Sequence, residues 1–430
     1  MRISLLLQRE PFGEILCATL ERFLPQLTGH THQVKWYHGK AQEGARFRRG
    51  GNSKANRHAG EQTWLCNFYL NAIFTSEAGG ETLEPVMREF GRSAVWWRRP
   101  AQRAYVELAA WRLTAPLLAQ ASIDITPAIP HDGDLLFVGG NHKLRLLDRR
   151  SNRAYGICKE GSNPNFLEQE IHARRLVEEL ALPVPKLDFV AEDGTWFSES
   201  YISGTPLNRL DDPAAARMVL AEMKRSLARL SQHTMRETSV GLYADELAAS
   251  IRQRVAGNKL LGAEDGGRGA WEERLQKMLN LLAPERGRTL QTTLAHGDFQ
   301  PANILCQNGA SWLIDWELSA RRQAGYDALV YAMHSRSPVG LAARLRDFCV
   351  AAGSLDGESS WLLANWPGAE WENEEARRVS ATLLLLEDLA MQLEENNNSR
   401  FVRMGEGLML LRKEFDDWSV VATASRNVYA

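Results

Sequence analysis

The spacing of apolar residues divides most of the chain into a strand-rich part and a helix-rich part. Between residues 131 and 205, short apolar runs such as DLLFVGG, NHKLRLLD and RAYGICKEG alternate with turn residues, as is typical of strands. One segment, residues 165–180, instead has the three- and four-residue spacing of a helix. From residue 211 onward helical spacing dominates. We therefore expect a small antiparallel sheet with one inserted helix, followed by a mainly helical region.

The first 130 residues have a pattern of their own. ISLLL, residues 3–7, is typical of a strand, and residues 12–27 have helical spacing after Pro11. The run ITPAIPHDGD, residues 125–134, contains two prolines and a glycine, which favour a break in regular structure. We therefore predict an extra N-terminal α/β domain at residues 1–130, followed by further domains at residues 131–205 and 206–430.

Composition and charge narrow the class of protein. Hydrophobic residues make up 44% of the chain and charged residues 24%, as in soluble globular proteins. A net charge of −2 gives no general attraction to nucleic acid. The five cysteines are scattered and show no CxxC spacing, which fits a reducing compartment better than a disulfide framework. We expect a cytoplasmic protein without a membrane span, while peripheral contact with a membrane stays open.

A basic segment interrupts the N-terminal region. GKAQEGARFRRGGNSKANRHAG, residues 39–60, has few apolar residues and six lysines and arginines. A solvated loop is the interpretation that we favour. The alternative is a surface that binds phosphorylated sugars, nucleic acid or lipid headgroups.

The most specific chemistry lies in two short stretches, HGDFQPANIL at residues 296–305 and WLIDWE at residues 312–317. Phosphoryl transfer needs a carboxylate that orients the acceptor hydroxyl, together with oxygen ligands for a metal that holds the phosphates. Asp298 can be that carboxylate. Asn303 and Asp315 can supply the hard oxygens that Mg²⁺ prefers.

These two stretches resemble the catalytic loop and the metal loop of the aminoglycoside phosphotransferase and choline kinase superfamily, a branch of the protein-kinase-like fold. The resemblance implies that Asp298 is the catalytic base and that Asn303 and Asp315 are the metal ligands. His296 would orient the loop. It also implies a bilobal α+β fold, with a small antiparallel sheet in the N-lobe and a mainly helical C-lobe.

Further segments resemble the nucleotide-binding parts of the same superfamily. Lys159, in AYGICKEG, would contact the α- and β-phosphates of ATP, and Glu170 would hold that lysine. Two other segments would surround the nucleotide: GDLLFVGGNHKLRLL as the first hairpin and SYISGTPL as the hinge. Their implied contacts are Gly139 and Gly140 at the hairpin turn and the backbone of Ser200 and Ile202 beside the adenine. The resemblance extends over residues 131–420.

The hairpin GGNHK lacks a full GxGxxG, a departure that concerns the nucleotide-loop residues only. Two other departures from the protein-kinase pattern bear on the substrate. Position 297 is Gly where a protein kinase has Arg. Asp327, which we expect to be structural, follows Asp315 by only twelve residues and leaves little room for a peptide-binding segment. A small-molecule acceptor is therefore expected. Residues 387–396, EDLAMQLEEN, could form an acidic helix that faces a cationic or polyol acceptor.

Each residue also has a plainer interpretation. Asp298, Asn303 and Asp315 are residue types that commonly form turns at strand ends. Lys159 and Glu170 could be a solvated strand lysine and a solvated helix glutamate, while Gly139 and Gly140 could form an ordinary hairpin. His296 with Asp298 could begin a metallohydrolase site, although no third ligand follows at short spacing.

The ordered set of residues favours ATP- and Mg²⁺-dependent phosphorylation of a hydroxyl on a small molecule. A sugar, an aminosugar or an amino alcohol is the expected acceptor. A more specific hypothesis is a bacterial envelope sugar, such as a residue of the lipopolysaccharide core. Two alternatives remain: a pseudokinase that acts as a binding or assembly module, and a protein in which residues 1–130 carry a separate activity.

Overall fold

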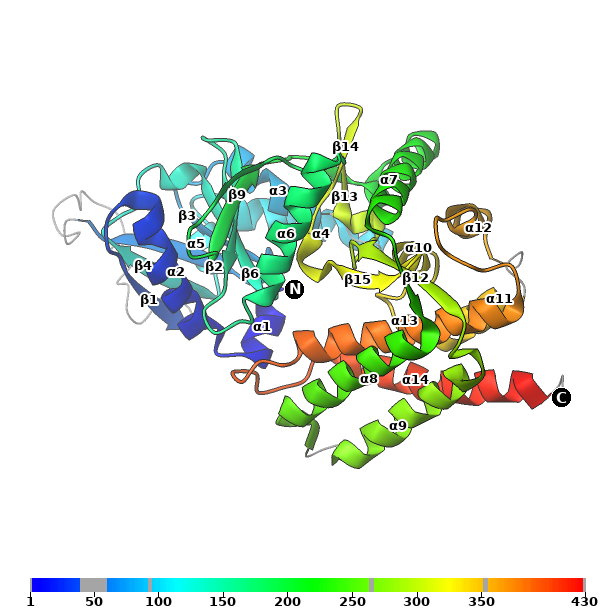
Figure 1. Cartoon of the computed structure of the whole chain (residues 1–430). Helices are drawn as coiled ribbons and strands as arrows, with labels where there is room; N and C mark the ends of the chain where they lie inside the picture. Colours follow the sequence, from blue (N-terminus) through cyan, green and yellow to red (C-terminus); the bar gives the residue numbers. More distant parts are fainter. Residues whose placement is uncertain (1, 39–59, 92–94, 263–266, 351–354, 428–430) are drawn as a thin grey trace. The chain divides into compact units, whose positions relative to one another are not determined.

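The computed structural model describes residues 2–38, 60–91, 95–262, 267–350 and 355–427 (Figure 1). Nearly all of the predicted basic segment, residues 39–59, lies outside this part of the chain. Contacts divide the chain into two compact units. The first unit comprises Met1–Glu168 and Lys186–Ser203, and the second comprises Gln169–Pro185 and Gly204–Ala430.

The first unit is built on a nine-stranded antiparallel sheet with the strand order β1-β4-β2-β3-β5-β6-β7-β9-β8. The strands are β1 Gln33–His38, β2 Gln62–Asn67, β3 Ala72–Thr75, β4 Ala121–Thr126, β5 Leu135–Val138, β6 Lys143–Asp148, β7 Arg153–Cys158, β8 Leu187–Val190 and β9 Trp196–Ser200. The strands expected within residues 131–205 are therefore present. β3 pairs with β5 in the register Ala72↔Val138 and Ile73↔Phe137, so the sheet continues into the N-terminal region.

Helices cover both faces of this sheet. α1 Ile3–Arg9 and α2 Phe12–Thr28 pack on one face, and α3 Gly80–Phe90, α4 Arg99–Ala110 and α5 Ala115–Leu118 pack on the other. The alternation of β2 shows why both faces need cover: Trp64 and Cys66 join the core under α1 and α2, while Leu65 joins the core under α3 and α4. Both sets of side chains are buried, so β2 is apolar on both faces.

Two expectations for the N-terminal region differ from the structure. ISLLL is helical, as part of α1, with Ile3 and Leu6 buried one turn apart and Leu5 exposed. A five-residue apolar run fits either a strand or a helix, and here the packing of one helical face decides. Residues 1–130 also belong to the same compact unit as β5, β6 and β7, because the β3–β5 pairing and a shared core join them.

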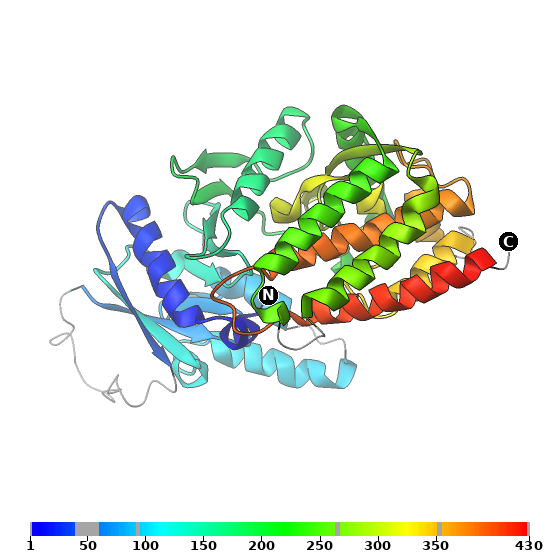
Figure 2. The same cartoon turned by 60° about the horizontal axis from the view of Figure 1, so that its bottom comes forward.

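The second unit is mainly helical. Its helices are α7 Pro213–Thr234, α8 Val240–Gly257, α9 Gly267–Leu282, α10 Tyr326–Ala332, α11 Leu341–Val350, α12 Gly357–Leu363, α13 Glu374–Glu395 and α14 Glu406–Asn427. α6 Asn165–Glu179 begins in the first unit and continues into the second. In both views α8, α9, α13 and α14 lie side by side (Figures 1 and 2). Within the described residues no helix combines the length and apolar character that crossing a membrane requires.

Two small antiparallel sheets complete the second unit. One has the strand order β10-β13-β14, with β10 Thr205–Pro206, β13 Ile304–Gln307 and β14 Ala310–Leu313. The other has the order β11-β12-β15, with β11 Arg236–Ser239, β12 Thr289–Ala295 and β15 Ala320–Gln323. The candidate catalytic residues follow β12 and β14 in the chain.

Candidate active site

The loop after β12 is anchored to the start of α10. The backbone N–H groups of His296 and Gly297 donate hydrogen bonds to the two carboxylate oxygens of Asp327, at 2.8 and 3.0 Å. Asp327 is buried, and burial raises the pKa of its carboxyl group while His296 and the two backbone N–H groups oppose that rise. Both carboxylate oxygens of Asp327 therefore hold the loop. This agrees with the structural role that the sequence predicts for Asp327.

Gly297 fits a backbone position that excludes other residues. Its φ angle is +88°, in the left-handed region. A Cβ atom at this position would lie 2.0 Å from the carbonyl oxygen of Leu318. Close approach of the two loops therefore explains why Gly stands where a protein kinase has Arg.

Asp298 and Asn303 are in direct contact. The side-chain nitrogen of Asn303 donates to Oδ2 of Asp298 at 2.8 Å and to its carbonyl oxygen at 2.9 Å. Gln300 donates a further hydrogen bond to Oδ2 at 2.9 Å. Because the amide nitrogen of Asn303 is used in this way, its amide oxygen is the atom left to act as a metal ligand. The 3-10 turn Pro301–Asn303 brings the two side chains together.

His296 connects the catalytic loop to the segment that carries Asp315. Nδ1 of His296 accepts a hydrogen bond from the N–H of Asp298 at 3.1 Å, so Nε2 carries the proton and donates to the carbonyl oxygen of Ile314 at 2.9 Å. The N–H of Ile314 donates to the carbonyl oxygen of Asn303 at 2.9 Å. Ile314, the residue before Asp315, is thus bonded to both His296 and Asn303. The same bonds fix the ring of His296, which agrees with the orienting role expected of it.

Asp315 adopts a backbone conformation that is unusual for its residue type. Its φ and ψ angles are 69° and 60°, between β14 and the 3-10 turn Trp316–Leu318. Such a conformation costs about 1 kcal/mol or more and is common at functional sites. The donor set of one carboxylate and one amide oxygen fits Mg²⁺, which usually takes one or two protein oxygens and completes its shell with phosphates and water. No cluster of three or more His, Cys, Asp or Glu that could hold a metal occurs within the described ranges.

Arg336 is a site residue that the sequence did not indicate. Its Nε lies 2.8 Å from Oδ1 of Asp298, and its Nη1 lies 3.1 Å from Oδ1 of Asp388. Nη2 also donates to the carbonyl oxygen of Gly297. Burial by itself lowers the pKa of this guanidinium, but Tyr326, Asp388 and Asp298 raise it well above its ordinary value. A single cation therefore joins the candidate catalytic carboxylate to α13.

The acidic helix expected at residues 387–396 begins with two buried carboxylates. Glu387 accepts hydrogen bonds from the hydroxyl of Tyr243 at 2.5 Å and from the backbone and side chain of Gln323 at 2.8 Å. Burial raises the pKa of Glu387 to about 7. Asp388 accepts a hydrogen bond from Tyr326 at 2.5 Å in addition to its ion pair with Arg336. These two acids are thus internal partners of the fold and do not form an exposed acidic face.

Lys159 follows β7 in the first unit and is fully buried. Its ammonium group donates to Oε1 of Glu10, to the carbonyl oxygen of Asn141 at 2.9 Å and to that of Gly140 at 3.4 Å. It is therefore not the solvated strand lysine of the plainer interpretation. Glu170 is also buried, 1% exposed, on the part of α6 that belongs to the second unit. The predicted pair of Lys159 and Glu170 stays a prediction.

The remaining nucleotide-binding predictions fall in the first unit. Gly139 and Gly140 begin the loop between β5 and β6, and a Cβ on Gly140 would lie 2.3 Å from the carbonyl oxygen of Lys143. The N–H of Ser200 donates to the carbonyl oxygen of Lys186, the residue before β8, at 2.9 Å. Ile202 lies in the coil just before Ser203, where the chain leaves the first unit. Contact of these four residues with a nucleotide stays a prediction.

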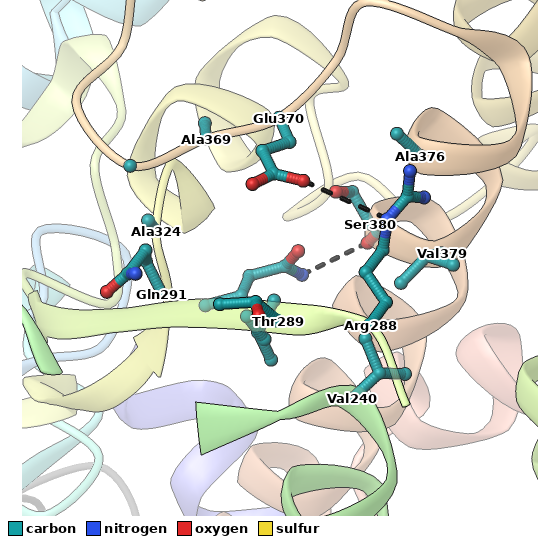
Figure 3. Close-up of a pocket in the computed structure, with 13 residues that line it drawn as sticks. Val240, Arg288, Thr289, Gln291, Ala324, Ala369, Glu370, Ala376, Val379 and Ser380 are labelled. Atoms are coloured by element: carbon teal, nitrogen blue, oxygen red, sulfur yellow. Dashed lines mark hydrogen bonds and ion pairs between the residues drawn. The ribbon is translucent and has the colours of Figure 1, made fainter. Parts of the chain in front are cut away.

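The second unit contains a small cavity (Figure 3). Its lining comes from β12, β15, α13 and the preceding loop, and includes Arg288, Gln291, Glu370 and Ser380. A volume of about 20 Å³ holds roughly one water molecule. The cavity is therefore too small to be the acceptor site.

Comparison with protein families gives one match. Residues 156–361 match the sequence model of the phosphotransferase enzyme family. The matched range contains all the predicted site residues except Gly139 and Gly140. A comparison with curated protein sequences gave no match.

Solved structures include several kinases that are similar to this chain. A choline kinase from Streptococcus pneumoniae has 12% identity and a TM-score of 0.43, covering 68% of this chain and 92% of its own. A thermostable mutant of the aminoglycoside phosphotransferase APH(4)-Ia, in a ternary complex with AMP-PNP and hygromycin B, has 15% identity and a TM-score of 0.45, covering 67% and 93%. A choline/ethanolamine kinase family protein from Mesorhizobium loti has 15% identity and a TM-score of 0.41, covering 75% and 98%.

Proposed function

We propose that this chain, which matches the phosphotransferase enzyme family over residues 156–361, transfers the terminal phosphoryl group of ATP to a hydroxyl group of a small molecule. The observation that carries this proposal is the hydrogen-bonded set around Asp298. The carboxylate is held by Asn303, and the carbonyl of Asn303 is in turn bonded to Ile314, the residue before Asp315. One base and two oxygen ligands are thus linked through short backbone and side-chain bonds.

The residues of this set have separate roles in the proposed reaction. Asp298 accepts the proton of the acceptor hydroxyl as the oxygen attacks phosphorus. Asn303 and Asp315 would hold Mg²⁺, which neutralises charge on the phosphates when bound. Arg336 fixes the carboxylate of Asp298 through its 2.8 Å ion pair, and this restricts the orientation from which the hydroxyl can approach.

A small acceptor fits the way the chain continues after Asp315. The turn Trp316–Leu318 leads through Ser319 into β15, which pairs with β12, and α10 begins at Tyr326. Every residue between Asp315 and α10 therefore belongs to a turn, a paired strand or a link of one or two residues. No residues are left in this connection for a peptide-binding segment. A sugar, an aminosugar or an amino alcohol is the class of acceptor that we propose.

A pseudokinase is the second candidate function. It would use the same fold to bind a partner without transferring phosphate. The intact set of Asp298, Asn303 and Asp315, with its bonding pattern, favours an active enzyme, because a binding module has no use for a held catalytic carboxylate.

The test is thermal unfolding with and without ATP, GTP and Mg²⁺, on the wild type and on Asp315→Asn. A ligand present at 100 times its Kd raises the free energy of unfolding by about 2.7 kcal/mol. A Mg²⁺-dependent rise in Tm that Asp315→Asn abolishes would support the nucleotide site. The control is Asp211→Asn, which changes an exposed carboxylate outside the site.

The two candidate functions then separate by turnover. Wild-type protein that binds Mg²⁺ and ATP should release ADP when a library of sugars and amino alcohols is supplied. Binding without acceptor-dependent ADP release across that library would favour the pseudokinase. No change in Tm with either nucleotide would contradict the proposed phosphotransferase and would favour the pseudokinase, which can bind a partner without a nucleotide.

A further inference from the structure

All hydrogen-bond donors of the Lys159 ammonium group have acceptors inside the first unit. An ammonium carries three N–H donors. In Lys159 they are directed to Oε1 of Glu10 and to the carbonyl oxygens of Asn141 and Gly140. The side chains of Lys159 and Glu10 are 0% and 1% exposed. Glu10 thus gives the lysine a buried negative charge that the sequence did not indicate.

Glu10 lies at the junction of α1 and α2, which are part of the core rather than a detachable cover. Its N–H closes α1 on the carbonyl of Leu6 at 2.9 Å, and α2 begins two residues later. Side chains from both helices share one core with the strands that lead to Lys159; from the helices these include Ile3, Leu6, Phe12, Leu16 and Phe23, and from the strands Phe137, Leu144 and Ile157. Displacing Glu10 would require this core to open.

The same helices fix the residues on either side of Lys159. The hydroxyl of Thr19 accepts the N–H of Glu160 at 2.9 Å. Arg22 forms an ion pair with Glu160 at 2.7 Å and donates to the carbonyl oxygen of Cys158. α2 therefore holds the backbone directly before and after the lysine.

The loop that carries Gly139 and Gly140 is held in a similar way. The side chain of Asn71 accepts the N–H of Ile3 at 2.8 Å and donates to the carbonyl oxygen of Gly139 at 2.8 Å. Arg9, at the end of α1, donates to Oδ1 of Asn141 at 3.0 Å. The N-terminal segment thus contacts both the loop and the lysine that are predicted to meet the phosphates.

Charge explains why a carboxylate is needed beside Lys159. A buried ammonium without a counter-charge tends to lose its proton, because burial disfavours the charged form. The pKa of Lys159 is lowered overall, and burial is the largest cause. Arg9 lowers this pKa further, while Glu10 and Cys158 raise it. A buried ion pair adds little to stability compared with apolar packing, so its value lies in what it holds in place.

We propose that Glu10 is a positioning residue for nucleotide binding, which holds Lys159 as a fixed, charged ammonium. A phosphate oxygen would take the donor that is now directed to the carbonyl oxygen of Gly140, the longest of the three bonds at 3.4 Å. This inference rests on the proposed function. It makes residues 3–28, α1 with α2, part of the nucleotide site rather than an accessory domain. Glu10 can act together with the predicted partner Glu170 or in its place.

The test compares Glu10→Gln with the wild type in two measurements across about pH 7 to pH 10, the range below the ordinary pKa of lysine. The first is the Kd of ADP with Mg²⁺ from calorimetry. The second is the Tm of the ligand-free protein. Glu14→Gln is the matched control, because Glu14 is an exposed carboxylate on α2. Glu10→Asp keeps the charge and separates its loss from a loss of packing.

The two measurements should respond to pH in opposite directions. Without the charge of Glu10, Lys159 loses its proton at lower pH, so Glu10→Gln should bind ADP roughly tenfold more weakly near pH 7, and the deficit should grow by up to about tenfold per pH unit. A lysine with a depressed pKa makes the folded state bind fewer protons than the unfolded state, so the variant gains stability as pH rises. The difference in Tm between the wild type and Glu10→Gln should therefore become smaller as pH rises. Glu10→Asp should bind ADP within several-fold of the wild type.

Three outcomes would overturn the inference. Wild-type affinity in Glu10→Gln at every pH would show that Glu10 is not needed. Tighter binding by the variant would make Glu10 a competitor of the phosphates. A Tm difference that does not change with pH would reduce the pair to a packing contact. If the wild type itself binds no ADP, the proposed function fails and the inference fails with it, whereas wild-type binding that Glu10→Gln leaves unchanged overturns the inference alone.

Discussion

Nε of Arg336 lies 2.8 Å from Oδ1 of Asp298, and the same guanidinium lies 3.1 Å from Asp388. The carboxylate that we assign to the acceptor hydroxyl is therefore oriented from two sides, by Arg336 on Oδ1 and by Asn303 on Oδ2. An acceptor hydroxyl that uses Oδ1 or Oδ2 must share it with one of these donors. This arrangement makes the orientation of the base depend on a residue outside both loops.

Replacing Arg336 should damage both activity and stability. Arg336 and Asp298 are partly exposed, but Asp388 is buried, and removing the cation beside a buried carboxylate costs up to about 3–5 kcal/mol. A small misplacement of a catalytic group can cost about a hundredfold in rate. We expect Arg336→Gln to lower kcat/KM by about a hundredfold and to lower Tm. Arg346→Gln is the control, because its ion pair with Asp347 is half exposed and should contribute under about 1 kcal/mol. An Arg336→Gln enzyme with normal kcat/KM would contradict the positioning role.

Replacing Asp298 should separate chemistry from nucleotide binding. Asp298→Asn keeps the shape of the side chain but cannot accept the proton of the hydroxyl. We expect kcat to fall by roughly 10²–10⁴-fold, the usual contribution of a general base. The Mg²⁺-dependent rise in Tm with ATP should persist, because Asn303 and Asp315 are unchanged. Full turnover by Asp298→Asn would rule out the proposed mechanism.

Adding a methyl group at Gly297 should be far more damaging than adding one at Gly309. Both glycines have positive φ angles, +88° and +79°, so both substitutions carry the cost of that conformation, about 1–2 kcal/mol. Only at Gly297 would the new Cβ meet the carbonyl oxygen of Leu318 at 2.0 Å, while at Gly309 nothing lies within 4 Å. Denaturant unfolding of Gly297→Ala and Gly309→Ala should show the larger loss for the first, and equal losses would contradict the close approach of the loops.

Glu387 should make stability depend on pH near neutrality. Its pKa is raised by burial to about 7 from the ordinary 4.5, so the folded state keeps a proton that the unfolded state has lost. Stability contributed in this way is complete below about pH 4.5 and is lost as pH rises through about 7, by up to about 3 kcal/mol. As pH rises between these values, the Tm of Glu387→Gln should therefore fall less than the Tm of the wild type.

The control for this prediction is a second glutamate on the same helix. Glu375 is exposed near the start of α13, and Glu375→Gln should follow the wild-type pH profile. Parallel profiles for the wild type and Glu387→Gln would mean that Glu387 does not titrate in this range.

The parts of the site that the sequence predicts are the parts that local chain geometry determines. Asp298 and Asn303 are five residues apart, and one turn brings them into contact. The contacts that escaped prediction join residues far apart in the chain: Arg336 is 38 residues from Asp298, and Glu10 is 149 residues from Lys159. Neither residue stands in a pattern that marks it, because the fold alone brings these pairs together.

The same distinction holds for the fold. The strands within residues 131–205 alternate with clear turn signals, and the sequence predicts them. The pairing of β3 with β5 depends on register across more than sixty residues, and two prolines at 127 and 130 suggested a boundary instead. Local breaks in structure indicate where the chain turns, but they do not indicate which strands then pair.

The interleaving of the two compact units has a consequence for how the protein is made. The chain passes between the units after residues 168, 185 and 203, so neither unit is a continuous piece of sequence. As the chain leaves the ribosome, β8 and β9 emerge only after residues 169–185, whose own partners appear later still. During synthesis the C-terminal part of α6 therefore stays without its packing partners until the second unit is made. A chain that stops soon after residue 203 should be a target for chaperones and proteases rather than a stable intermediate.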